Sequence, residues 1–245
     1  MRLQGRAVVV TGASRGMGLA IARRFAAEGA RVAMLARKAD ELEAAAAGVA
    51  DALPVVCDVS DPKSVQAAFA QIETELGGVD VLVNNAALAT PQLLEEADDA
   101  ASGLEVAVNL LGPLYCMRHA VASMRRRGGG DIINVSSESV ATHYPYLGLY
   151  AATKSALETL SAAARYELSV HNIRVTVYRS GRVQSTFHHH WDAEMLARVR
   201  AAAEATGFVA QSGASISPEI PAQAMVDLVL LDRSARIDFL QLRGA

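Results

Sequence analysis

The sequence predicts an α/β domain in which a parallel sheet is covered by helices on both faces. Short apolar runs of strand length alternate with longer segments of helical periodicity, the arrangement expected of a doubly wound sheet. No internal repeat, linker or break in composition divides the 245 residues, a length that suits one domain of this class. We therefore expect a single domain that spans residues 1–245.

Short apolar runs along the chain are predicted as buried strands of the sheet. They are Ala7–Val10, Arg31–Ala36, Leu53–Cys57, Val81–Asn84, Asp131–Ser136, Arg174–Tyr178 and Ile237–Leu242. Helices are expected between them. The first, Gly18–Glu28, has apolar residues on one face and is ended by Gly29.

The segment 187–221 differs in composition from the rest of the chain. It carries three consecutive histidines and Trp191, then an Ala-rich helical pattern, and then a turn-rich stretch, Gly207–Pro221. Loops of this length within a compact domain are usually functional or disordered. We predict that this segment is a lid over the substrate site.

Composition and charge exclude several classes of function. The net charge of −3 and the short cationic run Arg125–Arg127, interpreted as a helix end, argue against a nucleic-acid partner. Cys57 and Cys116 have no Cys or His nearby at ligand spacing, so neither a zinc site nor a disulfide is expected, and a reducing cytoplasm is the natural location. No apolar run approaches the roughly 20 residues that span a bilayer, so no membrane association is expected.

A glycine-rich segment, T-G-A-S-R-G-M-G at residues 11–18, follows the first strand and opens the first helix. Gly12 permits a tight turn, Gly16 lets the main chain approach phosphates, and Gly18 lets the helix pack on the strand. The helix N-terminus supplies free N–H groups and partial positive charge, so the segment predicts a dinucleotide pyrophosphate site. A purely structural turn is the alternative, because a glycine cluster alone is a weak signal.

The end of the second strand indicates which dinucleotide is preferred. An acidic residue there would bind the adenosine ribose and repel a 2′-phosphate, but the strand is followed by Arg37 and Lys38. Arg37 offers a planar fork suited to phosphate, and Arg15 in the glycine turn can reach the same region. NADP(H) is therefore the predicted cofactor, preferred over NAD(H). The alternative is that Arg37 and Lys38 are solvated charges at a helix entry.

Tyr150 and Lys154 are four residues apart and therefore share one face if their segment is helical. A nearby cation favours phenolate and lowers the pKa of a phenol, which would make Tyr150 a usable acid or base near neutral pH. Ser137, at the end of a strand, can hold the substrate oxygen. Asn109, a polar residue in an apolar helical run, could anchor a water that links Lys154 to solvent, or be a satisfied buried amide.

With these motifs in place, the chain resembles the short-chain dehydrogenase/reductase family from about Gly5 to about Ser185, and within it the NADP(H)-preferring carbonyl or ketoacyl reductases. The resemblance is carried by the glycine turn, C-D-V at residues 57–59, N-N-A-A at residues 84–87, and Asn109, Ser137, Tyr150 and Lys154. It implies a single-domain Rossmann fold with about seven strands, a homodimer or homotetramer, and a set of cofactor-binding residues. These are Gly12, Ser14, Arg15, Gly16, Met17, Gly18, Arg37, Lys38, Asp58, Val59, Asn85, Ala86, Ala87, Tyr150, Lys154, Gly181, Val183 and Ser185.

The predicted function is interconversion of a ketone or aldehyde with an alcohol, with Tyr150 as general acid/base and Asn109, Ser137 and Lys154 completing the catalytic set. Residues after Ser137 should face the substrate, and they suggest a ringed or polar molecule: Glu138, His143, Tyr144 and Tyr146. A metal at the three histidines is not expected, because consecutive residues rarely converge on one ion. The alternatives are a non-catalytic NADP(H)-binding regulator and a dehydratase or epimerase on the same fold.

Overall fold

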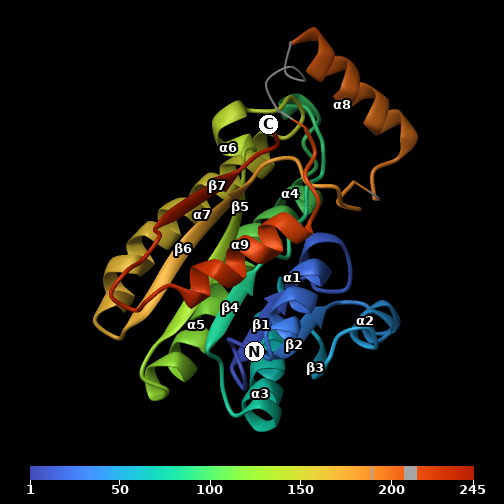
Figure 1. Ribbon diagram of the computed structural model, residues 1–245. Coiled ribbons are helices and arrows are strands. Elements are labelled where there is room, and N and C mark those ends of the chain that lie inside the picture. The colour runs from blue at the N-terminus through green and yellow to red at the C-terminus, as the bar shows by residue number, and fades with distance from the viewer. Residues whose placement is uncertain (189, 207–213) are drawn as a thin grey trace.

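The computed structural model, which describes residues 1–188, 190–206 and 214–245, contains one parallel sheet of seven strands (Figure 1). The strands are β1 (Ala7–Thr11), β2 (Arg31–Ala36), β3 (Ala52–Val56), β4 (Val81–Asn84), β5 (Gly130–Ser137), β6 (Ile173–Ser180) and β7 (Phe239–Leu242). Their order across the sheet is β3-β2-β1-β4-β5-β6-β7. The chain winds from β1 out to β3 and then returns to the other side of β1. The switch point of the strand order, where open α/β sheets bind ligands, therefore lies at the carboxyl ends of β1 and β4.

Helices connect the strands and cover both faces of the sheet (Figure 1). They are α1 (Gly16–Ala27), α2 (Ala39–Ala46), α3 (Pro62–Leu76), η1 (Leu94–Glu96), α4 (Asp99–Val106), η2 (Ala107–Leu111), α5 (Gly112–Arg126), α6 (Ser139–Thr142), α7 (Gly148–Ser169), α8 (Ala193–Ala205) and α9 (Glu219–Leu230). α1 packs against α9, and α3 packs against α5. α8 lies at the top of the molecule, away from the sheet (Figure 1).

The core consists of two apolar layers, one on each face of the sheet. Because successive strand residues point to opposite faces, Val8 and Val10 of β1 belong to one layer and Val9 to the other. The first layer includes Phe25 of α1 and Met225 of α9. Both faces are therefore buried, which explains why the strands are apolar without alternation.

The predicted single-domain doubly wound fold is confirmed, and the predicted strands all form. Arg31–Ala36 and Val81–Asn84 have the predicted bounds, and the other strands differ by one or two residues at one or both ends. The first helix begins at Gly16, two residues before the predicted start, because Arg15 takes the extended N-cap position. Arg126 ends α5 and Arg127 caps it, as expected from the cationic run.

The helix that carries Asn109 is not uniformly α-helical. α4 and α5 are continuous through η2, a π-helical turn in which Asn109 is fully buried. π-turns within α-helices occur frequently at functional sites. The whole helix, Asp99–Arg126, is long and apolar enough by length and composition to cross a membrane, which the sequence reading did not recognise. Much of it instead lies in the core, where Cys116, Ala120 and Met124 are fully buried.

The predicted lid segment 187–221 falls into three parts. Residues 189 and 207–213 lie outside the described residues, so the first seven residues of the turn-rich stretch are not described. The Ala-rich pattern forms α8 as expected. The last three residues, Glu219 to Pro221, are wrongly assigned to the lid, because they form the first turn of α9, which packs on α1.

We predict opposite effects on stability from the same substitution at two helical glycines. A methyl group on Gly18 in α1 would overlap the Gly12 carbonyl oxygen and also the Asn85 amide nitrogen, at 2.6 Å. Gly18→Ala should therefore lower the free energy of unfolding by about 1–3 kcal/mol. Gly103→Ala in α4, where nothing lies within 4 Å of the added methyl, should raise it by up to about 1 kcal/mol. Urea denaturation of both variants measures this, and a stable Gly18→Ala protein would contradict the close packing.

Candidate active site

The glycine turn joins β1 to α1 at the switch point between β1 and β4. Gly12 and Gly16 have positive φ angles of 65° and 55°, which side-chain-bearing residues rarely adopt. Position 18 must be glycine for the different reason that α1 packs directly against the Gly12 carbonyl. The sequence therefore forms a tight turn that brings the first turn of α1 to the end of β1.

Hydrogen bonds tie this turn to the end of β4. The Thr11 hydroxyl accepts from the backbone N–H groups of Asn85 and Ala86, each at 3.0 Å. The Asn85 side-chain amide donates to the carbonyl oxygens of Thr11 at 2.9 Å and Gly12 at 3.3 Å. Asn85 and Ala86 thus hold the glycine turn against the end of β4. The sequence analysis predicted them only as cofactor-binding residues and not as supports of this turn.

The N-terminus of α1 is suited to a pyrophosphate. No described side chain caps it, and its first turn contains no acidic residue. The first N–H groups of a helix lack intrahelical partners, and together with the helix dipole they attract an anion. Ser14 is half-buried, and Arg15 is exposed beside the turn. The loop after β6 reaches this point, since Ser185 Cβ lies 3.7 Å from where a Cβ of Gly16 would be.

Basic residues gather near this turn, but they are not equivalent. Lys38 Nζ lies 2.6 Å from Glu41 Oε1, and Arg15 also interacts electrostatically with Glu41. Arg37 is exposed and makes no ion pair with any residue that the structure describes. Lys38 therefore matches the alternative interpretation as a helix-entry charge, whereas Arg37 and Arg15 remain candidates for a 2′-phosphate.

Other predicted cofactor contacts lie at the same edge of the sheet. The Asp58 carboxylate accepts from the Ser60 N–H at 2.9 Å and its hydroxyl at 2.7 Å. Val59 is buried against Gly112 of α5, so its side chain belongs to the core. Val183 pairs with Ile216 in an isolated bridge, and the Gly181 N–H donates to Leu242 O at 2.9 Å. Ala87 follows Ala86 and is half-buried.

Tyr150, Ser137 and Lys154 meet at the carboxyl end of β5. The Ser137 hydroxyl lies near the Tyr150 phenol and lowers its pKa. Lys154, one turn after Tyr150 on α7, has its Nζ 5.8 Å from the centroid of the phenol ring and donates to Val135 O at 2.8 Å. The predicted helical face is thus present, and both groups are held by β5.

The expected effect of Lys154 on Tyr150 is corrected by the structure. Burial raises the pKa of Tyr150 to about 12, because the loss of water destabilises the phenolate more than the nearby Ser137 hydroxyl stabilises it. Burial likewise lowers the pKa of Lys154 to about 8. Sequence spacing predicted a lowered phenol pKa because it showed the cation but not the degree of burial. In this state of the protein Tyr150 is an acid rather than a phenolate at neutral pH.

Asn109 connects the helix through η2 to its surroundings. Its amide donates to Leu88 O at 2.7 Å and Thr153 Oγ1 at 3.1 Å, and its oxygen accepts from Leu88 N at 2.8 Å. Both amide protons are therefore used by protein groups. The side chain matches the interpretation as a satisfied buried amide, and a water could contact only its oxygen.

The predicted substrate residues are divided among three environments. The Glu138 carboxyl is buried, accepts from the Tyr144 hydroxyl at 3.2 Å, and leaves Oε2 without a hydrogen-bond partner among the described residues. Burial raises the pKa of Glu138. The Tyr146 ring lies 5.3 Å from the Arg198 guanidinium of α8. Tyr146 therefore faces α8.

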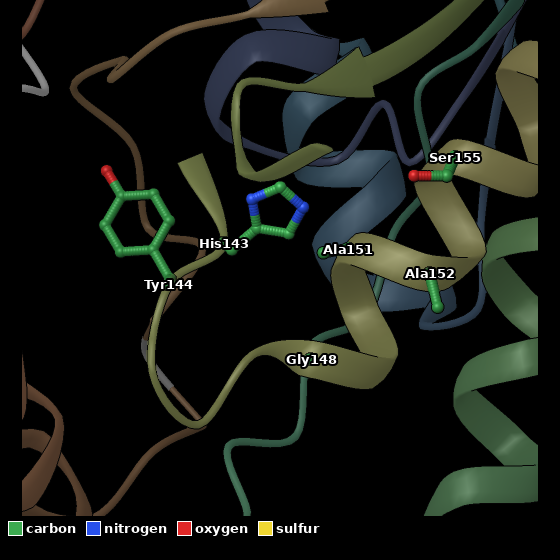
Figure 2. A pocket seen from close by; sticks show the side chains of 6 residues that line it. All are labelled: His143, Tyr144, Gly148, Ala151, Ala152 and Ser155. Carbon is green, nitrogen blue, oxygen red and sulfur yellow. The ribbon is translucent and has the colours of Figure 1, made fainter. Parts of the chain in front are cut away.

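His143 and Tyr144 line a cavity of about 320 Å³ at the start of α7 (Figure 2). Gly148, Ala151, Ala152 and Ser155 complete its lining, and Figure 2 shows the two rings pointing in different directions. Neither Ser137 nor Tyr150 lines this cavity. The hollow is thus beside the reacting group and not at it, so the assignment of His143 to the substrate wall gains no support from this geometry.

The first part of the predicted lid packs against Tyr150. The Phe187 ring centroid lies 5.7 Å from that of Tyr150. His190 Nε2 and Trp191 Nε1 each lie 2.8 Å from Ala89 O. A carbonyl oxygen has two lone pairs, so Ala89 O can accept from both side chains when His190 carries its proton on Nε2. His190 therefore helps to hold the loop that contains Ala89. Among the described residues, which exclude His189, no group of three His, Cys, Asp or Glu could hold a metal ion.

Two residues near the site were missed by sequence reasoning. Phe187 was included only as the first residue of the lid. Glu105 is 1% exposed in α4, and its carboxylate accepts from the Thr90 N–H at 2.7 Å. A carboxylate four residues before Asn109 in an apolar helical run was a detectable signal, because that spacing places both on one helix face.

Comparison with known proteins gives consistent matches. The family model described as short chain dehydrogenase matches residues 6–196. A sorbitol dehydrogenase from Cereibacter sphaeroides is 36% identical over 198 residues, which cover 78% of this chain and 75% of that protein. A galactitol 2-dehydrogenase from Agrobacterium fabrum is 33% identical over 195 residues, covering 78% and 75%. The crystal structure of L-sorbose reductase from Gluconobacter frateurii, complexed with NADPH and L-sorbose, has a TM-score of 0.85 at 28% identity and covers 99% of this chain and 97% of that one.

We predict that the Trp191 hydrogen bond restrains the lid. Trp191→Phe keeps an aromatic ring against His188 but removes the donor to Ala89 O. Loss of one hydrogen bond of about 1 kcal/mol should raise the open population, and with it the rate of limited proteolysis within residues 187–206, by about fivefold. Tyr166→Phe, on an exposed ring of α7, is the matched control and should leave the rate unchanged. Identical cleavage of wild type and Trp191→Phe would show that this contact does not hold the lid.

Proposed function

This chain belongs to the short-chain dehydrogenase family, and we propose that it is an NADP(H)-dependent oxidoreductase that interconverts a ketone and an alcohol on a polyhydroxylated substrate. The observation that carries the proposal is the Tyr150 phenol, which has the Ser137 hydroxyl near it and is followed one helical turn later by the buried ammonium of Lys154. An acid/base, a hydroxyl that can hold the substrate oxygen, and a cation are the groups that carbonyl reduction requires.

The residues present fit a dinucleotide. The uncapped N-terminus of α1 and the backbone of Gly12 and Gly16 would hold the pyrophosphate, and Arg15 and Arg37 would hold a 2′-phosphate. When bound there, NADP(H) supplies or accepts the hydride. That the related L-sorbose reductase was solved with NADPH supports this choice.

Tyr150 performs the proton transfer. In reduction its hydroxyl gives a proton to the substrate oxygen, and in oxidation the phenolate takes a proton from the alcohol. Because burial raises the pKa of Tyr150 to about 12, the phenol is protonated at neutral pH, which is the state that reduction needs. The Ser137 hydroxyl orients the substrate oxygen, and Lys154 stabilises the negative charge left on Tyr150.

A polyhydroxylated substrate is supported by Glu138. This carboxyl follows Ser137 directly, is 3% exposed, and has an oxygen that lacks a hydrogen-bond partner among the described residues. A buried acceptor of this kind is stabilised by a hydroxyl donor, which a polyol or sugar supplies. The named activities of the sorbitol and galactitol dehydrogenases are of the same class. Assembly into a homodimer or homotetramer, and a cytoplasmic location, stay predictions.

Removal of the phenol tests the reaction. Tyr150→Phe should lower kcat by at least about 100-fold, because it removes the proton donor, while the Kd for NADPH stays within about twofold. The assays use ketohexoses with NADPH and hexitols with NADP⁺, and Tyr166→Phe is the control. A wild-type protein that binds NADPH and turns over none of these substrates would contradict the substrate class, and full activity of Tyr150→Phe would contradict the mechanism. Net oxidation of NADPH with substrate distinguishes this activity from dehydration or epimerisation.

The choice of cofactor is tested at the end of β2. Arg37→Ala should weaken NADPH binding by about tenfold or more and leave NADH binding unchanged, because only NADPH carries the 2′-phosphate. Lys38→Ala should have a much smaller effect, since that ammonium is already paired with Glu41. Fluorescence titration measures both. Equal affinity of the wild-type protein for NADPH and NADH would show that the preference is wrong.

A further inference from the structure

Glu105 is a buried carboxylate that the proposed reaction does not use. It lies in α4, 1% exposed, one helical turn before Asn109. A carboxylate is rarely fully buried unless it is paired, because its transfer from water is costly. Its position therefore requires partners inside the protein.

One partner is the loop of residues 88–92. Glu105 Oε2 accepts from the Thr90 N–H at 2.7 Å, and Asn109 on the same helix face holds Leu88 through its N–H and its carbonyl. Ala89, between them, accepts from His190 and Trp191. The loop is thus fixed on one side by the helix of Glu105 and on the other by the lid.

The second group that Glu105 acts on is Lys154, with which it forms no ion pair within 4 Å. α4 packs against α7, and Asn109, on the same helix face as Glu105, donates to Thr153 Oγ1, beside Lys154, at 3.1 Å. The Glu105 charge raises the pKa of both Lys154 and Tyr150. The Lys154 ammonium is 1% exposed, and its hydrogen bond is to the neutral carbonyl of Val135. The loop 88–92 carries no ionisable side chain. Among the described residues, Glu105 is the carboxylate that acts on this ammonium.

We propose that Glu105 is a positioning residue of the active site, which supplies the counter-charge that keeps Lys154 an ammonium and fixes the loop 88–92 on α4. A buried cation without an opposite charge tends to lose its proton, and Glu105 opposes that loss. Its effect on turnover rests on the proposed function. Its effect on the Lys154 charge does not.

The directions of the pKa shifts agree with this arrangement. Burial raises the pKa of Glu105 to about 6 while Lys154 lowers it, and burial lowers the pKa of Lys154 to about 8 while Glu105 raises it. Both groups are therefore charged between about pH 6 and pH 8. Below that window Glu105 is protonated and the counter-charge is lost, and above it Lys154 loses its own proton. The Glu105 charge also raises the pKa of Tyr150, which keeps the phenol protonated.

An NMR titration of the lysine side chains tests the counter-charge without any substrate or cofactor. The sequence contains three lysines, Lys38, Lys63 and Lys154, so the labelled signals are easily assigned. Glu105→Gln keeps an oxygen acceptor for Thr90 and nearly the same shape but removes the charge. It should lower the titration midpoint of Lys154 by about one pH unit. Glu95→Gln, which removes an exposed carboxylate in η1, should leave that midpoint unchanged. An unchanged midpoint in Glu105→Gln overturns the proposal.

Two further measurements keep the proposal testable if Glu105→Gln does not fold. Glu105→Asp retains the charge and should keep the Lys154 midpoint near that of the wild type. In the wild-type protein, the Lys154 signals should show a second, smaller step near pH 6 as Glu105 titrates, and the absence of that step overturns the proposal.

The kinetic readout separates a counter-charge from a merely structural role. In Glu105→Gln the alkaline limb of the kcat profile should move to lower pH by the same amount as the Lys154 midpoint, and the difference from wild type should vanish below about pH 6. A loss of kcat that is equal at every pH, with an unmoved alkaline limb, overturns the proposal. A wild-type protein that is inactive on all substrates leaves the Lys154 titration interpretable and contradicts only the proposed function.

Discussion

The buried ammonium of Lys154 is the constraint on which the catalytic half of the structure depends. A cation with 1% exposure is stable only where the protein replaces the water that it has lost. The Val135 carbonyl at the end of β5 supplies a hydrogen bond, and Glu105 of α4 supplies negative charge. β5, α7 and α4 must therefore keep their relative positions, and Tyr150, one turn before Lys154 on α7, is placed by the same requirement.

The loop 88–92 connects the helix that carries Glu105 to residues 190 and 191. Three separate elements end on it: Asn109 of η2 holds Leu88, Glu105 of α4 holds Thr90, and the lid residues His190 and Trp191 hold Ala89. Backbone groups in a loop after a strand need hydrogen-bond partners. Here the partners are side chains of the helix through η2 and of residues 190 and 191. Any displacement of residues 190–191 and any displacement of the helix that carries Glu105 and Asn109 would therefore act on the same short segment.

The predicted nucleotide site, formed by the glycine turn at residues 11–18 and the start of α1, is built on a different principle. It uses main-chain geometry in place of buried charge: positive φ angles at Gly12 and Gly16, close contact at Gly18, and a helix end that no described side chain caps. Charged groups there remain exposed, so they can meet a phosphate without desolvation beforehand. The two halves join where Asn85 ties the glycine turn to the end of β4.

The sequence by itself determined the doubly wound fold, the place of the glycine turn, and the meeting of Ser137, Tyr150 and Lys154, because strand and helix periods and short-range spacing are local properties of the chain. It did not determine that Lys38 pairs with Glu41, that one Glu138 oxygen has no hydrogen-bond partner among the described residues, or that His143 lines a cavity apart from Tyr150. Only the tertiary structure decided the sign of the shift at Tyr150. The pKa of a group depends on how much water the rest of the chain removes from it, and burial by distant segments does not follow from the spacing of a Tyr and a Lys along one helix.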